Sequence, residues 1–294
     1  MSKFREALDA GTFPLVAELK PPKGIALEEM LAPVSALRGR VAAFGVPDNQ
    51  HARMGLSPLA AGRLVKEAGG EPLVHLTCRD RNRLALESDL LGAAALGMEN
   101  LLLVSGDYVT LGDHPQAKPV YDADSVQLLQ IARGLTAGKD SADLPLTGSP
   151  SFFLGAVVIP EAEPLGPQLI KFNKKLAAGA QFFVTPPVFD LEKLRRFREG
   201  LPYPPPKLLV SIKVLDAQEV AQAAAGQWRK VYSLPPDLLQ QLAGLEPEQT
   251  LLKGAELAGS ILKIIKAENL AHGVYLKGKG RIDLFIRVLE VAGV

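Results

Sequence analysis

The chain has 294 residues, of which 47% are hydrophobic and 22% charged, and its formal net charge is +1 at pH 7. A charge so close to neutral argues against a nucleic-acid groove or a membrane surface as the main partner. Cys78 is the single cysteine, which excludes an internal disulfide, an all-cysteine metal site and an iron–sulfur cluster. We expect no metal site.

The first residues lack the apolar core of a signal peptide, and no apolar run reaches the roughly 18–20 residues that a membrane span needs. We therefore expect a cytoplasmic protein.

Short apolar runs alternate with longer helical patterns along nearly the whole chain. There are eight runs, at residues 14–19, 40–46, 72–78, 100–106, 152–159, 180–185, 207–214 and 271–277. Most are apolar at consecutive positions, as is typical of parallel strands buried on both faces. Strand followed by helix, repeated along the chain, indicates a βα series.

This series predicts an α/β protein, a single closed (β/α)8 TIM barrel over residues 1–294, because such barrels typically take about 250 residues. An open doubly wound sheet is the alternative. Residues 227–252 are expected to form a helical insertion before the last strand, under which Trp228 and Tyr232 could pack. The tandem prolines 186 and 187 are expected to stop the sixth strand.

Functional groups of such a barrel lie where strands end and βα loops begin. Glu18 ends the first run and is followed by two prolines. A carboxyl group in this apolar setting is expected to have a raised pKa and to act as a general acid. The alternative is a rim glutamate paired with Lys20.

Hydrogen-bonding side chains also follow the second and third runs. Residues 48–50 are Asp, Asn and Gln, although Pro47 and Asp48 would equally suit a turn. His75 and Thr77 share one face of the third strand, and residues 79–82 add four polar groups. This density favours ligand binding, although some of these groups can cap the next helix.

The fourth and fifth runs lead into further candidates. Gly106 allows close approach to the backbone, and Asp107 places a carboxylate at the rim. The loop that follows exceeds the usual length of about 2–6 residues, although Asp124 can simply cap a helix. The helix after the fifth run carries Lys171, Lys174 and Lys175, which could bind phosphate or form a solvated face.

Taken together, these motifs resemble the short bacterial and archaeal branch of the methylenetetrahydrofolate reductases. The resemblance rests on the order of HLTCRDRN (75–82), SDLLGA (88–93), SGD (105–107), KPVYDADS (118–125) and LEVAGV (289–294). It runs from about residue 14 to the end of the chain.

The resemblance implies an FAD-dependent oxidoreductase that reduces 5,10-methylenetetrahydrofolate to 5-methyltetrahydrofolate, in the one-carbon metabolism that serves methionine biosynthesis. Glu18 and Asp107 would be the catalytic residues, Glu18 as the general acid and Asp107 near the flavin and the pterin. NAD(P)H or an iron–sulfur partner subunit would reduce the flavin, and the protein would be an oligomer or part of a hetero-complex. The residues implied to bind the cofactor are Asp48, His75, Thr77, Arg79, Asp80, Asn82, Ser105, Gly106, Asp107, Tyr121, Asp122, Ala123, Asp124 and, at the flavin phosphates, Lys174 and Lys175.

Four positions depart from the family pattern. Pro47 stands where the family commonly has Thr, Pro186 replaces a folate-contacting Gln, Ile159 an aromatic residue and Glu163 a His. Proline offers no side-chain hydrogen bond, so one pterin contact and one flavin contact must be absent or supplied by other groups. Two alternatives stay open: a pterin-binding barrel that transfers the methyl group without flavin, and a non-catalytic barrel subunit of a larger redox complex.

Overall fold

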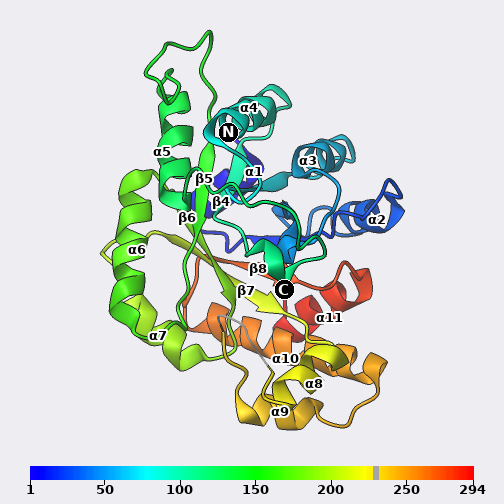
Figure 1. Ribbon diagram of the computed structural model, residues 1–294. Helices are drawn as coiled ribbons and strands as arrows, with labels where there is room; N and C mark the ends of the chain where they lie inside the picture. The colour runs from blue at the N-terminus through cyan, green and yellow to red at the C-terminus, as the bar shows by residue number, and fades with distance from the viewer. Residues whose placement is uncertain (228–231) are drawn as a thin grey trace.

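The computed structural model describes residues 1–227 and 232–294, and its strands form a closed parallel barrel in sequence order, surrounded by helices (Figure 1). This confirms the predicted (β/α)8 barrel and excludes the open sheet. The strands are β1 Leu15–Glu18, β2 Ala43–Val46, β3 Pro72–Thr77, β4 Asn100–Val104, β5 Phe153–Val157, β6 Phe182–Pro187, β7 Lys207–Lys213 and β8 Gly273–Lys277.

The chain also forms helices, which except for α1 pack their apolar faces against the outside of this barrel. They are α1 Lys3–Asp9, α2 Glu28–Ala36, α3 Pro58–Glu67, α4 Arg83–Ala95, α5 Ser125–Thr136, α6 Leu165–Ala178, α7 Leu191–Glu199, α8 Ala217–Ala224, α9 Pro236–Leu242, α10 Pro247–Ala267 and α11 Ile282–Ala292, with short 3₁₀ turns η1 Gln50–Ala52 and η2 Val109–Leu111. None of these helices is both long and apolar enough to cross a membrane, within the residues that the structure describes.

The predicted insertion before the last strand contains α9 and the beginning of α10. Tyr232 is buried, and its ring lies 5.7 Å from that of Phe189, centroid to centroid. Trp228, the other aromatic residue expected there, lies outside the described residues.

Helix α1 closes the amino-terminal end of the barrel, which the sequence analysis did not anticipate. Phe4 and Leu8 are one helical turn apart and fully buried among the inward side chains of the strands. The Phe4 ring packs edge-on against Phe153 and Phe182, with centroids 5.8 and 5.4 Å away. Lys207 at the start of β7 donates a hydrogen bond of 2.7 Å to the Leu8 carbonyl. With this end filled, the barrel opens at its carboxyl-terminal end.

The expectation that the tandem prolines stop β6 was wrong, because the strand continues through Pro187. Its register against β7 shifts between Val184 and Pro187. Hydrogen bonds that use side-chain hydroxyls join the strands there: Ser211 N donates to Thr185 Oγ1 (2.9 Å), and Ser211 Oγ donates to the Thr185 carbonyl (2.5 Å). The strand therefore tolerates residues that have no N–H to give to the ladder.

Candidate active site at the carboxyl-terminal mouth of the barrel

An ion pair between β1 and β8 lies in the mouth of the barrel. Ala17 is in register with Leu276, so the next residues, Glu18 and Lys277, lie at the same level. Lys277 Nζ pairs with Glu18 Oε2, and the two side chains are only 18% and 11% exposed. Gln50 in η1 donates from Nε2 to both carboxylate oxygens, at 3.2 Å each. Glu18 is thus held by three hydrogen bonds from two donor groups, and its partner is Lys277 rather than Lys20.

The expected direction of the Glu18 pKa shift was wrong. Burial does act to raise the pKa, but the charge and hydrogen bond of Lys277, with smaller contributions from His75 and Gln50, outweigh it. The pKa of Glu18 is therefore lowered, and the group is a carboxylate at neutral pH.

A neutral histidine lies beside this pair. His75 on β3 has its Nε2 3.1 Å from the hydroxyl of Tyr275 on β8. Burial lowers the pKa of His75 to about 4, so the imidazole is uncharged at neutral pH. The Tyr275 ring occupies the space next to Gly45, where an added Cβ would lie 2.0 Å from the Tyr275 hydroxyl. Glycine at this position therefore permits the contact between Tyr275 and His75.

Asp48 and Thr77 connect the loop after β2 to the end of β3. The Asp48 side chain is fully buried. Its Oδ2 accepts hydrogen bonds from both the N–H and the hydroxyl of Thr77, at 2.9 Å each, and from Arg81 Nη1 at 2.6 Å. Arg81 also pairs with Asp89 on α4. The loop is therefore fixed by a buried, charge-assisted network.

Arg79 joins three loops at the mouth. Its side chain is 2% exposed and donates from Nε and Nη2 to Asp80, at 2.8 Å each. The same guanidinium donates to the carbonyls of Asn49 (3.2 Å) and Asp107 (3.3 Å). Asn82 caps α4 by accepting from Ala85 N at 3.0 Å, as one of the expected alternatives had it.

Asp107 lies at the rim with its side chain 54% exposed. His51 Nδ1 is 3.5 Å from Asp107 Oδ2, and the hydrogen bond from this histidine lowers the pKa of the aspartate. Tyr121 donates its hydroxyl to the carbonyls of Gly106 (3.2 Å) and Asp107 (3.1 Å), which fixes the loop. Gly106 has φ of +90°, and Ser105 beside it is exposed.

The DAD segment within KPVYDADS serves local structure. Asp122 accepts from Arg83 N at 2.9 Å, and Asp124 caps α5 by accepting from Val126 N and Gln127 N at 2.8 Å. Ala123 is buried between them. The capping alternative for Asp124 is confirmed.

Lys174 and Lys175 on α6 are not equivalent. Lys174 is exposed, whereas Lys175 is largely buried and donates from Nζ to the Val157 carbonyl at the end of β5, at 2.7 Å. Burial, with a smaller contribution from Lys171, lowers the pKa of Lys175 to about 8. Within the described residues, neither lysine has a hydrogen bond or ion pair to the loops after β3 and β4.

Sequence reasoning missed Lys277 and Glu161. Lys277 ends the eighth run as Glu18 ends the first, and barrel closure makes those ends neighbours, so the fold prediction already contained the signal. Glu161 is 6% exposed and accepts from the backbone N–H of Phe189 (3.0 Å) and Ser233 (2.7 Å), which ties the segment before α9 to the end of β6. Nothing in the local sequence marks Glu161 as a buried acceptor.

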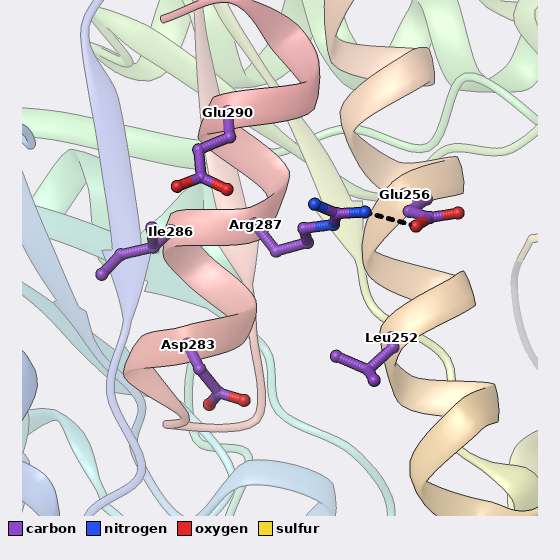
Figure 2. Close-up of a pocket in the computed structure, with 6 residues that line it drawn as sticks. All are labelled: Leu252, Glu256, Asp283, Ile286, Arg287 and Glu290. Atoms are coloured by element: carbon purple, nitrogen blue, oxygen red, sulfur yellow. Dashed lines mark hydrogen bonds and ion pairs between the residues drawn. The ribbon is translucent and has the colours of Figure 1, made fainter.

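A shallow groove lies away from this mouth, between α10 and α11 (Figure 2). Arg287 crosses it and bonds to Glu256 at 2.6 Å. Its lining residues are Leu252, Glu256, Asp283, Ile286, Arg287 and Glu290. The groove is a solvated seam between two helices, and the clustered polar chemistry lies at the mouth.

Known proteins resemble this chain in sequence. Residues 3–278 match the family model described as methylenetetrahydrofolate reductase. A curated relative, the 5,10-methylenetetrahydrofolate reductase of Pectobacterium carotovorum subsp. carotovorum, is 26% identical over 211 residues, which are 71% of this chain and 65% of the relative. The match thus spans slightly less than two thirds of that relative's length.

Two solved structures share the fold. An uncharacterized protein from Clostridium thermocellum, described as binding two copies of 5-methyl-5,6,7,8-tetrahydrofolic acid, has a TM-score of 0.62 at 13% identity, over 98% of this chain and 96% of that one. An EDTA monooxygenase from Chelativorans sp. BNC1 has a TM-score of 0.57 at 12% identity, over 96% and 92%. At these identities both structures support the fold alone.

Proposed function

The chain belongs to the methylenetetrahydrofolate reductase family, and from this premise we propose that it reduces 5,10-methylenetetrahydrofolate to 5-methyltetrahydrofolate with FAD as its cofactor. The observation that carries the proposal is Glu18, a carboxyl group in the mouth of the barrel with its side chain 11% exposed. The named relative and the folate-binding neighbour with the same fold support the choice of a reduced folate as substrate.

The donor groups on this face suit a dinucleotide cofactor. Lys175 uses one of its three N–H groups on the Val157 carbonyl, among the described residues, which leaves two for a phosphate. Lys174 lies exposed on the same helix. Bound at this face, FAD would supply the hydride that reduces the methylene carbon.

The protein's own contribution is to place a proton and hold the pterin. Opening the five-membered ring of the folate requires a proton on the departing nitrogen, and Glu18 is the carboxyl group that would deliver it. The exposed carboxylate of Asp107 can accept hydrogen bonds from the pterin or the flavin. Hydrogen bonds from Arg79 fix the loop that carries Asp107 and the loop after β2, which carries Gln50, the second donor to Glu18.

The electrons would come from outside this chain. Cys78 is fully buried, and burial raises the pKa of its thiol to about 12, so it is not suited to thiol–disulfide exchange. We propose that NAD(P)H or an iron–sulfur partner subunit reduces the flavin.

The test is Glu18→Gln, which keeps the shape of the side chain and removes its titratable proton. The reduction of the folate should fall about 10²–10⁴-fold, the usual share of general acid catalysis, while flavin binding and flavin reduction remain. Flavin absorbance follows the two half-reactions separately. The matched control is Glu163→Gln, an exposed glutamate paired with Arg196. If Glu18→Gln reduces folate at the wild-type rate, or loses its flavin, Glu18 is not the general acid. A purified wild-type protein that transfers the methyl group without flavin would favour the transferase alternative.

A further inference from the structure

The partner of Glu18 is a lysine from the neighbouring strand, inside the barrel mouth. We propose that Lys277 is a positioning residue for the acid: its ammonium group holds Glu18 ionised and oriented into the mouth until the folate binds. The inference rests on the proposed function only in taking Glu18 as the acid.

The geometry gives Glu18 a defined orientation. The register of β1 against β8 brings the two side chains to the same level, so the ion pair needs no loop to form it. Gln50 approaches both carboxylate oxygens at 3.2 Å from the loop after β2. Donors from two different elements therefore converge on one carboxylate, and truncating Lys277 would remove the charged one.

Three other titratable groups around Glu18, namely His75, Tyr275 and Tyr232, are uncharged at neutral pH. Burial lowers the pKa of His75 to about 4, and burial raises the pKa of Tyr275 on β8 and of Tyr232 before α9. Lys213 at the end of β7 pairs with Glu219 instead. Within the described part of the chain, Lys277 is thus the full positive charge that offsets the burial of Glu18.

This arrangement sets the order of the proton steps. Glu18 first takes up a proton from solvent; it then gives that proton to the departing nitrogen as the C–N bond breaks and its electron pair moves to the nitrogen. After the transfer Glu18 is again the carboxylate that Lys277 stabilises. The lysine therefore makes Glu18 a stronger acid, but it also lowers the fraction of Glu18 that is protonated at a given pH. Folate reduction should therefore fall as pH rises through the pKa of Glu18.

Removing the charge should shift this dependence. In Lys277→Met no ammonium group opposes the effect of burial on the pKa of Glu18. The descending limb of the pH profile, where folate reduction by the reduced flavoprotein falls, should therefore move upward by about 1–3 pH units, the usual size of a pKa shift caused by a neighbouring opposite charge. Lys277→Arg should restore the wild-type limb. Lys213→Met is the matched control, because this similarly buried lysine pairs with Glu219, and its limb should not move.

An infrared titration of the carboxyl groups in folate-free protein separates this inference from the proposed function. The protonated carboxyl band of Glu18, identified by its loss in the Lys277→Met/Glu18→Gln double variant, should appear at higher pH in Lys277→Met than in the wild type. An unchanged titration, or an equal shift in Lys213→Met, would overturn the inference. If no variant reduces folate but the band shifts as expected, the proposed function fails and the role of Lys277 in the charge state of Glu18 is still supported.

Discussion

Replacing Asp48 by alanine tests whether the loop network at the mouth is structural. The fully buried carboxylate accepts two hydrogen bonds from Thr77 and pairs with Arg81, whose side chain is 16% exposed. Removing one partner of a buried charge pair lowers the free energy of unfolding by about 3–5 kcal/mol. Each Thr77 donor left without an acceptor lowers it by about 1–3 kcal/mol. Because Arg81 keeps Asp89 as a partner, we expect a loss below the sum of these costs, about 3–5 kcal/mol in the free energy of unfolding.

Urea unfolding, followed by circular dichroism, measures this loss. Asp89→Ala is the control: it removes the more exposed acidic partner of the same arginine and should cost less than about 1 kcal/mol. Asp48→Asn keeps an acceptor for Thr77 and should fall between the two. A loss below about 1 kcal/mol in Asp48→Ala, together with loss of the flavin, would refute the structural interpretation and favour direct cofactor binding.

Two further predictions concern the plug, the helix α1 that closes the amino-terminal end of the barrel, and the partly buried Lys175. Phe4→Ala should lower the free energy of unfolding by about 3–5 kcal/mol, because the Phe4 ring fills the closed end of the barrel. Ile25→Ala, at an exposed position, is the control and should change the free energy of unfolding very little. Equal losses for the two variants in urea unfolding would contradict this prediction. Lys175 has a pKa of about 8 against 10.5 for a free lysine, so the unfolded chain binds more protons between these values and stability contributed by this group rises with pH there. Lys175→Met should therefore stabilise the flavin-free protein at pH 7, with a gain that fades by about pH 10 in urea titrations, and a pH-independent gain would refute the argument.

The periodicity of the sequence was sufficient to predict the barrel. Each run of consecutive apolar residues became a strand, because residues on both faces of a parallel strand are buried. Helix α1 was missed because its apolar face consists of only two residues, Phe4 and Leu8, whose burial depends on the closed barrel above them. The prolines of β6 were misjudged because the hydroxyls of Thr185 and Ser211 join the strands at the point where the prolines offer no donor.

The location of the candidate residues follows from the fold, but their charge does not. Glu18 ends β1, His75 lies in the second half of β3 and Asp107 follows β4, and a barrel collects these strand ends at one face. The charge state of Glu18 depends on Lys277, which lies 259 residues away in sequence, so the local apolar setting indicated the wrong direction of its pKa shift. The structure places Asp48 and Arg79 in buried hydrogen-bond networks, which the sequence cannot distinguish from exposed polar groups; their expected contact with the cofactor stays a prediction.

The plug formed by α1 also has a consequence for biosynthesis. The helix leaves the ribosome well before its partners Phe153, Phe182 and Lys207, the last of which comes 199 residues after Leu8. At translation rates of about 5–20 residues per second, the side chains of Phe4 and Leu8 stay without their final contacts for about 10–40 s. The contacts that close the amino-terminal end of the barrel can thus be complete only after β7 has been synthesised, and during that interval the nascent protein exposes two apolar residues to chaperones.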